Sequence, residues 1–305
     1  MLQKSIIRKV LVLSGEIWGM NSFILRISWV SLIGFCLLVS LHLVINCEAA
    51  TSKNKPYRII SLSPSLSEIL FSIGAGEQVI AVDNYSNYPT NAPKTNLSAY
   101  EPNLEAIASL EPDLVIFSYD IDHLSKGLNL AGIRTLLLPA PKDFDEILQQ
   151  IKILGQITIN TKKAEKLIFF MQDEMGKLIL KREKQQPQKI YHEIDENYYS
   201  ASTFSFIGSI YAKLNFINIA DPADKGEHGY PKLSPEHIIA SNPDLIITTG
   251  ENKELILKIK KRPGWKHINA IRNNMLLQIN PDIASRWGPR IINFASDIVN
   301  FVELD

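Results

Sequence analysis

The strongest constraint on the fold of this chain is a phrase that occurs twice, about 130 residues apart. The sequences NLEAIASLEPDLVI and SPEHIIASNPDLII occupy residues 103–116 and 234–247. In each copy a glutamate, Glu105 or Glu236, stands seven residues before a proline, and an aspartate and an apolar run follow that proline. Two phrases with the same internal spacing indicate a chain built from two similar lobes.

Each copy of the phrase predicts a short helix, a turn and a buried strand. The helix is expected to end before the proline, because proline disfavours helical geometry in the residue that precedes it. The runs at residues 114–117 and 245–247 are short and almost wholly apolar, which is typical of a parallel strand covered on both faces. One such join is common in α/β proteins, so the duplication rests on finding it twice.

The first lobe begins with a predicted strand at residues 58–62 that leads into a helix. Ser65 and Glu68 have the spacing of a capping box at the start of this helix, and Gly74 stands where its C-terminus is expected. Further strands are predicted at residues 78–82, 114–117 and 135–138. Strands that alternate with helical patterns predict the α/β class, with a central parallel sheet in each of two Rossmann-like lobes.

A long amphipathic stretch from Thr161 to about Gln185 predicts one helix between the lobes. About 25 residues at ~1.5 Å each would make a rod of about 37 Å, stiffer than a loop. The second lobe then restarts with a predicted strand at residues 189–194 and closes with a helix at residues 291–302. The predicted domains are a leader at 1–50, a linker at 51–56, an N-terminal lobe at 57–158, the linking helix at 159–187 and a C-terminal lobe at 188–305.

The N-terminus has the pattern of an export signal. Residues 27–47 contain no Asp, Glu, Lys or Arg and follow several basic residues. The run is close to the ~20 residues that span a bilayer, so a retained anchor is one alternative. Met20 is an alternative start to Met1. Both cysteines, Cys36 and Cys47, lie in this leader, so the exported body contains neither a disulfide nor a thiolate site.

Three outcomes are open for this leader. Cys47 closes the apolar run in the manner of a bacterial lipoprotein processing site, although Asn46 stands where a small residue is usual. Cleavage after Ala49 or Ala50 is the second outcome, and retention as an anchor is the third. Each of them places the protein outside the cytoplasm, in a periplasm or on the outer face of the cytoplasmic membrane.

Charge and motifs exclude two classes of function. Residues 1–50 hold four basic and two acidic residues, which leaves 28 basic against 30 acidic in the remainder. A net charge near −2 argues against nucleic-acid binding, which needs a basic face. The body has no Gly-x-Ser-x-Gly elbow, no phosphate-binding glycine loop and no cysteine nucleophile, so catalysis is not expected.

The ordered set of motifs resembles the periplasmic binding proteins of cobalamin and ferric-siderophore ABC importers, and is most similar to the cobalamin-binding branch. The resemblance runs over residues 57–303 and rests on RIISLSPS at 58–65, DNYSNYP at 83–89, the two repeated phrases, the long helix and RWGPR at 286–290. It implies two lobes joined by a backbone helix, with a ligand captured between them and delivered to a permease. It implies no cofactor beyond that ligand.

Ligands of open α/β sheets bind beyond the carboxyl ends of the strands, which predicts where the ligand residues lie. Tyrosine and tryptophan rings there would offer the broad apolar area that a corrin or haem ring requires. The resemblance adds weight to Tyr85, Tyr100, Tyr230, Asp282 and Arg286. The full set of predicted ligand-binding residues is Ser63, Pro64, Ser65, Tyr85, Tyr100, Tyr199, Tyr230, Asp282, Arg286 and Trp287.

By the same resemblance, Glu105 and Glu236 would each dock onto arginines of the permease. Two carboxylates in equivalent positions suit a pseudo-symmetric basic partner. The alternative is that each is a solvated acid favoured by the helix dipole. The expected partners are therefore the ligand, the permease with its ATPase subunit and, through the N-terminus, the membrane. The protein itself is expected to be a monomer.

Two other ligand classes stay open. The first is a ferric siderophore or haem, since aromatic walls suit these as well. The second is a zinc or manganese ion. The candidate metal ligands show no close spacing such as His-x3-His, and they are His123, His192, Glu193, His228, His237 and Asp282.

Overall fold

Two four-stranded parallel sheets with the same strand order organise the chain in the computed structural model, which describes residues 57–250 and 254–303. The first sheet has the order β2-β1-β3-β4 and the second the order β6-β5-β7-β8. We call the parts built around them the N-terminal and C-terminal lobes. The strands are β1 (Ile59–Leu62), β2 (Val79–Val82), β3 (Leu114–Phe117), β4 (Arg134–Leu137), β5 (Gln188–Glu193), β6 (Phe216–Asn218), β7 (Leu245–Thr249) and β8 (Leu276–Ile279). The two-lobed α/β prediction is confirmed.

The helices cover these sheets and lie close to the predicted ranges. In β1 and β3 every residue is buried, as expected of strands covered on both faces. The last helix, α13, fills the predicted range at the C-terminus. The helices are α3 (Pro64–Ser72), α4 (Leu104–Ala108), α5 (Leu124–Leu130), α6 (Phe144–Ile157), α7 (Thr161–Glu183), α8 (Phe206–Lys213), α9 (Pro235–Ser241), α10 (Glu254–Lys260), α11 (Asn269–Arg272), α12 (Pro281–Ala284) and α13 (Ile291–Glu303).

The repeated phrase forms the same joint in both lobes. The carboxylate of Asp113 accepts a hydrogen bond from the backbone N–H of Arg58 at 2.8 Å, just before β1. The carboxylate of Asp244 accepts one from the backbone N–H of Lys189 at 2.9 Å, near the start of β5. In each lobe the aspartate therefore attaches the start of the central strand, β1 or β5, to the segment that leads into its neighbour, β3 or β7.

The register of the sheets relates the two lobes residue by residue. Ile59 of β1 pairs with Leu114, and Ile190 of β5 pairs with Leu245, which follow the two prolines at the same distance. Two residues after Ile59 and Ile190 stand Ser61 and His192, which are therefore equivalent positions in the two lobes. The two lobes thus carry a buried polar residue at the same place in the central strand.

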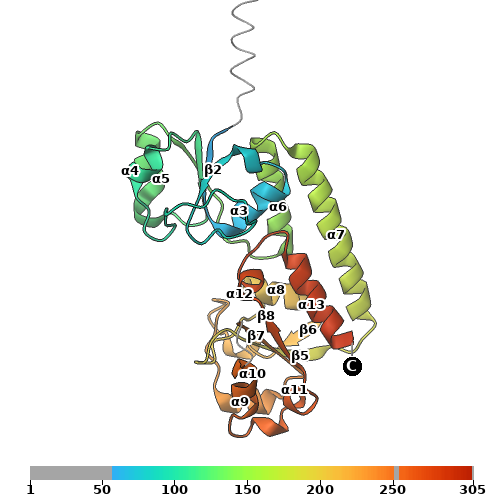
Figure 1. Cartoon of the computed structure of the whole chain (residues 1–305). Helices are drawn as coiled ribbons and strands as arrows, with labels where there is room; N and C mark the ends of the chain where they lie inside the picture. The colour runs from blue at the N-terminus through green and yellow to red at the C-terminus, as the bar shows by residue number, and fades with distance from the viewer. Residues whose placement is uncertain (1–56, 251–253, 304–305) are drawn as a thin grey trace, which may run out of the picture. The chain divides into compact units, whose positions relative to one another are not determined.

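The long helix α7 packs along α6 and α13 (Figure 1). Its buried Arg182 lies 4.2 Å from the ring centroid of Phe216, and its Nε donates to the carbonyl of Leu214 at 3.3 Å. These contacts attach the end of α7 to the C-terminal lobe. Buried side chains of both sheets and of α7 form one large apolar cluster, and the remaining buried side chains of the N-terminal sheet form a second one with α4 and α5. The exact domain boundaries stay a prediction.

The capping-box prediction for α3 is wrong. The helix begins at Pro64, so Ser63 is its N-cap, and no side chain caps it. Ser65 is then the second helical residue and cannot cap. Glu68 is buried, and its carboxylate accepts hydrogen bonds from Arg286 and Arg290 instead. The prediction for Gly74 fits the structure, since this residue follows α3 with a φ of +77°.

The predicted leader lies outside the described residues. Within residues 57–250 and 254–303, no helix has both the length and the apolar character needed to span a bilayer.

Candidate functional site

A cavity of about 610 Å³ lies at the carboxyl ends of the N-terminal strands. Residues at or after the ends of all four strands contribute to its wall, as the general rule for open α/β sheets predicts. Trp287 reaches it from the C-terminal lobe. The lining residues are Leu62, Ser63, Pro64, Asp83, Tyr85, Ala99, Tyr100, Ser118, Tyr119, Ile121, Pro139, Ala140 and Trp287.

Three tyrosines give this N-lobe cavity a broad aromatic wall. The rings of Tyr85 and Tyr100 meet edge to face, with their centroids 5.5 Å apart. Tyr119 follows β3, and all three side chains are more than half exposed. Exposed aromatic rings on a concave wall are unusual for surface residues without a ligand and typical of binding sites.

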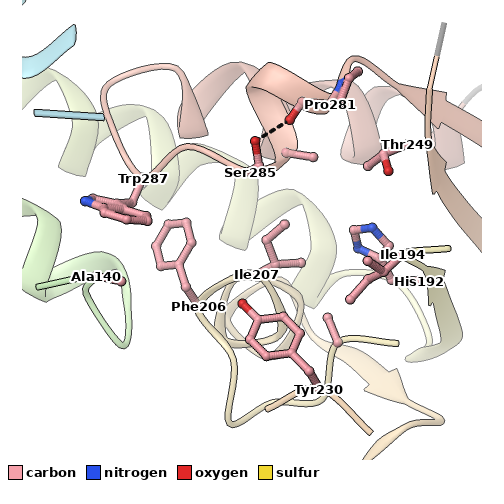
Figure 2. A pocket seen from close by; sticks show the side chains of 12 residues that line it. Ala140, His192, Ile194, Phe206, Ile207, Tyr230, Thr249, Pro281, Ser285 and Trp287 are labelled. Carbon is pink, nitrogen blue, oxygen red and sulfur yellow. Dashed lines mark hydrogen bonds between the residues drawn. The ribbon is translucent and has the colours of Figure 1, made fainter. Parts of the chain in front are cut away.

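A second cavity, of about 220 Å³, lies at the carboxyl ends of β5, β7 and β8 (Figure 2). Most of its wall is apolar. Ser285 is one of its polar residues, and its hydroxyl donates to the carbonyl of Pro281 at 2.7 Å. The lining residues are Ala140, His192, Ile194, Ala201, Phe206, Ile207, Tyr230, Thr249, Pro281, Ala284, Ser285 and Trp287.

The two cavities share Ala140 from the N-terminal lobe and Trp287 from the C-terminal lobe. Each cavity therefore has wall residues from both lobes. A ligand that covers Trp287 would contact both cavities at once. We call them the N-lobe cavity and the C-lobe cavity.

His192 is the most deeply buried titratable residue of the C-lobe cavity wall. Its Nδ1 lies 2.7 Å from the hydroxyl of Tyr211, which is fully buried behind it. Burial lowers the pKa of His192 to about 4 and raises that of Tyr211 well above its ordinary value. At neutral pH both groups are uncharged.

Asp83 is the one carboxylate in the wall of the N-lobe cavity. Its Oδ1 accepts a hydrogen bond from Ser86, and its Oδ2 has no partner among the described residues. Burial raises the pKa of Asp83, although hydrogen bonds from Ser86 and the charge of Arg286 oppose the rise. Lysine and arginine are absent from the residues that line either cavity.

A buried ionic network joins the two lobes beside the N-lobe cavity. Arg286 donates to Glu68 at 3.1 Å, to Asn87 at 2.7 Å and to the carbonyl of Tyr85 at 3.2 Å. Arg290 donates to the same glutamate at 2.9 Å. The network therefore holds the segment after α12 against α3 and the loop that carries Tyr85.

Six of the ten predicted ligand residues line the cavities: Ser63, Pro64, Tyr85, Tyr100, Tyr230 and Trp287. The other four line neither cavity. Ser65 is buried within α3, and Tyr199 lies beneath the Nζ of Lys232 at 5.9 Å. Asp282 forms an ion pair with Arg286 at 2.9 Å and accepts a hydrogen bond from Asn87 at 2.8 Å. Asp282 and Arg286 therefore both belong to the ionic network.

Sequence reasoning missed several wall residues. Tyr119 and Thr249 end or follow predicted strands, so the rule that found Ser63 could have found them too. His192 was considered only as a metal ligand. Phe206 lies on α8 and lines the C-lobe cavity through packing, which no local sequence pattern indicates.

The candidate metal ligands are dispersed. Within the described part of the chain, no group of three or more His, Cys, Asp or Glu side chains could hold a metal ion. Glu193 binds Arg262 through both carboxylate oxygens, and the Nε2 of His237 contacts the carbonyl of Ile219 at 2.8 Å. The described residues therefore offer no support for a zinc or manganese site.

The two predicted docking glutamates occupy equivalent positions. Glu105 lies in the first turn of α4 and Glu236 in the first turn of α9, and both side chains are exposed. The N-caps of these helices, Asn103 and Ser234, each accept a hydrogen bond from a backbone N–H of the first turn.

Comparison with known proteins places these features in a family. Residues 59–283 match the periplasmic binding protein family, which is most of the chain. An uncharacterized ABC transporter substrate-binding lipoprotein of Bacillus subtilis is 29% identical over 269 residues, covering 85% of this chain and 83% of the relative. A cobalamin-binding protein of Halobacterium salinarum is 27% identical over 264 residues, covering 83% and 71%.

Solved structures agree with this assignment. A possible iron-binding (periplasmic solute-binding) protein of Staphylococcus epidermidis has a TM-score of 0.70 and 29% identity, covering 81% of this chain and 99% of that one. A periplasmic haem-binding protein of Vibrio cholerae has a TM-score of 0.72 at 22% identity, covering 81% and 98%, which shows a common fold. The chain therefore belongs to the periplasmic binding protein family and serves an ABC importer as its binding protein, not as an enzyme.

Proposed function

We propose that this protein captures cobalamin or a related corrinoid at the two adjoining cavities and delivers it to the permease of an ABC importer. The observation that carries the proposal is an aromatic wall around Trp287 that both lobes contribute to and whose described residues include no lysine or arginine. Relatives named as cobalamin-binding proteins support the same choice.

Among the described residues that line the cavities, the absence of cationic side chains favours a corrinoid over anionic ligands. Haem carries carboxylate side chains, and many ferric siderophores are anionic, so both are best held by arginine or lysine. Cyanocobalamin has no net charge, and uncharged amides edge its corrin ring. Among the described residues that line the two cavities there is no lysine or arginine to hold an anion.

The tyrosine side chains supply the contact area that a large flat ring needs. Tyr85 and Tyr100 flank the N-lobe cavity, and Tyr230 lines the C-lobe cavity. Tyrosine and tryptophan offer stiff apolar surface with a polar tip, at a low cost in conformational entropy. The wall therefore suits a macrocycle that is apolar on its faces and polar at its edge.

Calorimetric titration of the chain from Thr51 with cyanocobalamin, haem and a ferric siderophore in parallel tests this proposal. We expect tight one-to-one binding of cyanocobalamin, weakened at least tenfold by Tyr85→Ala and by Tyr230→Ala. Phe169→Ala is the matched control, because Phe169 is an exposed aromatic residue on α7 that lines neither cavity. No heat with cyanocobalamin, at any temperature tried, would reject the corrinoid.

An iron ligand is the second candidate. The relative from Staphylococcus epidermidis is named as a possible iron-binding protein, and tyrosine hydroxyls are good ligands for ferric iron. Heat with haem or the ferric siderophore and none with cyanocobalamin would keep the importer role and change the substrate to iron.

We further propose that Glu105 and Glu236 dock onto basic residues of the permease. Their exposure and equivalent positions in the two lobes support this role. Glu105→Lys combined with Glu236→Lys should abolish ligand uptake by cells and leave the affinity for ligand unchanged. Glu165→Lys, on the exposed side of α7, is the control and should leave uptake intact. Lost ligand affinity in the double variant would reject the docking role.

For the N-terminus we propose lipidation at Cys47, since the Bacillus subtilis relative is named as a lipoprotein. Cys47→Ser should then release the protein from the membrane fraction or block its maturation. Mass spectrometry of the mature N-terminus distinguishes lipidation from cleavage after Ala49 or Ala50 and from a retained anchor.

A further inference from the structure

The wall of the C-lobe cavity contains a histidine, His192, whose hydrogen-bond partner indicates where its ring proton lies. The His192 ring lies in the cavity wall beside Ile194 and Thr249 (Figure 2). Only 2% of the residue is exposed. Its Nδ1 meets the Tyr211 hydroxyl at 2.7 Å, and either group could in principle supply the proton of that hydrogen bond.

The surroundings of Tyr211 decide which group donates. This side chain is fully buried, and its ring packs against Phe216 and Phe294. Among the described residues, Nδ1 of His192 is the one hydrogen-bond partner of its hydroxyl. If Nδ1 carried the proton, the tyrosine O–H would lack an acceptor, at a cost of about 1–3 kcal/mol. The hydroxyl therefore donates to Nδ1.

The ring proton of His192 consequently lies on Nε2. Burial keeps the ring neutral at physiological pH, so no second proton is present. Nε2 has no hydrogen-bond partner in the described part of the chain. Unlike Oδ2 of Asp83, which is fully buried, Nε2 remains accessible. In this tautomer His192 presents a fixed N–H donor to the cavity and no lone pair for a metal.

We propose that His192 is a specificity-determining residue whose Nε2–H donates to an uncharged oxygen acceptor of the ligand in the C-lobe cavity. This inference rests on the proposed function and extends it. The amide carbonyls at the edge of a corrin ring have the required chemistry. A carboxylate does not fit, because a neutral donor in an apolar wall leaves its charge unbalanced. Coordination of the ligand's cobalt or iron by His192 would require the proton to move to Nδ1, which would leave the Tyr211 hydroxyl without an acceptor.

The donor can select ligands because no protein group in the described part of the chain pairs with it. A buried polar group that gains its partner only from the correct ligand discriminates strongly against ligands that lack that partner. An apolar ligand of the same shape would leave Nε2–H unpaired. Tyr211 acts as a positioning residue, since it contacts the histidine and holds its tautomer.

Nitrogen-15 NMR of the ligand-free full chain tests the tautomer without reference to any ligand. We expect a bare Nδ1 and a protonated Nε2 at pH 7, with the signals assigned by their loss in His192→Gln. Tyr211→Phe should produce a mixture of tautomers. A protonated Nδ1 or an imidazolium in the unaltered chain would overturn the proposal, whatever the protein binds.

Binding measurements with cyanocobalamin test the role of the donor. His192→Leu keeps the approximate volume and removes the donor, and should weaken binding about tenfold. His192→Gln retains an N–H and should weaken it less. Equal affinity of His192→Leu and the unaltered chain would overturn the role in recognition. If cyanocobalamin does not bind at all, the proposed ligand fails, and the NMR result still decides the tautomer.

Aquocobalamin provides the last arm of the test, because its exchangeable axial position binds bare imidazole nitrogens and changes the visible spectrum. We expect no spectral change on binding that depends on His192. A change present in the unaltered chain and lost in His192→Leu would show coordination and reject the donor assignment.

Discussion

The two lobes share a framework and differ at the ends of their central strands. Strand order, register and the Pro-Asp joint are the same in both. At equivalent positions, however, β1 carries Ser61 and is followed by Ser63, whereas β5 carries His192 and is followed by Ile194. The N-lobe cavity is about 610 Å³ and the C-lobe cavity about 220 Å³. The two lobes thus have the same sheet, while the residues at the strand ends line two different cavities.

Each lobe also buries one glutamate, and the two have different partners. Glu68 binds arginines from the other lobe, whereas Glu193 binds Arg262 of its own lobe. Arg262 also stacks within 4.6 Å of the ring centroid of Trp265. One carboxylate therefore connects the lobes, and the other stabilises a single lobe.

The largest expected effect comes from neutralising the glutamate that connects the lobes. Glu68→Gln would leave Arg286 and Arg290 without their shared carboxylate, and we expect the free energy of unfolding to fall by about 3 kcal/mol. Because Arg286 also holds the carbonyl of Tyr85, affinity for cyanocobalamin should fall as well. Urea unfolding and calorimetry measure the two effects.

Glu193→Gln is the matched variant. It should lower stability less, since Arg262 keeps its aromatic contacts, and it should leave affinity unchanged. Equal effects on affinity in both variants would contradict the distinction between the two glutamates.

The second prediction concerns pH, and it applies to one lobe only. The pKa of His192 is about 4 in the folded protein, below its ordinary value of about 6.5, so the unfolded chain takes up the proton first. This contribution to stability is complete above pH ~6.5 and is lost as the pH falls toward 4. At pH 5 the loss should be about 2 kcal/mol.

Urea unfolding at pH 7 and pH 5 checks this prediction. His192→Gln should remove the loss, because it removes the titrating group. His267→Gln is the control at an exposed histidine and should change little. The N-terminal lobe has Ser61 at the equivalent position, and this residue does not titrate, so it adds no pH dependence to the stability. A pH dependence that persists in His192→Gln would assign it to other groups.

The third prediction compares the two aspartate joints. Removing either carboxylate should lower the free energy of unfolding by about 1–2 kcal/mol, because each accepts a hydrogen bond from a backbone N–H. Asp244→Ala should cost more than Asp113→Ala, since Asp244 also accepts from Asn269 at 2.9 Å. Equal losses in urea unfolding would show that the second hydrogen bond is compensated by water.

The sequence predicted the framework well because the signals for it are local. Proline, aspartate and a short apolar run together determine a helix end, a joint and a buried strand, so both copies of the phrase could be interpreted without tertiary information. The predicted strand at 135–138 was one residue late, since β4 spans Arg134–Leu137 and lies at the edge of its sheet.

The partners of Glu68 could not be predicted in the same way. Its spacing from Ser65 fits a capping box, but Pro64 starts the helix one residue earlier, and the arginines that it binds are remote in sequence. Ser63 and Tyr85 could be predicted because each follows a predicted strand, and ligands of open α/β sheets bind beyond the carboxyl ends of the strands. Phe206 enters its cavity only through helix packing.

The smallest expected effect lies at the residue before each repeated proline. Glu111 and Asn242 both adopt left-handed backbone conformations, with φ of 49° and 50°. This conformation costs an ordinary L-residue about 1–2 kcal/mol, and asparagine tolerates it better. Glu111→Asn should therefore raise the free energy of unfolding by about 0.5 kcal/mol. Asn242→Glu should lower it, because it also removes the hydrogen bond that the side chain accepts from the backbone N–H of Asn269. A loss of stability in Glu111→Asn would mean that the glutamate side chain itself stabilises the N-terminal joint, and the two joints would then differ in chemistry as well as in strain.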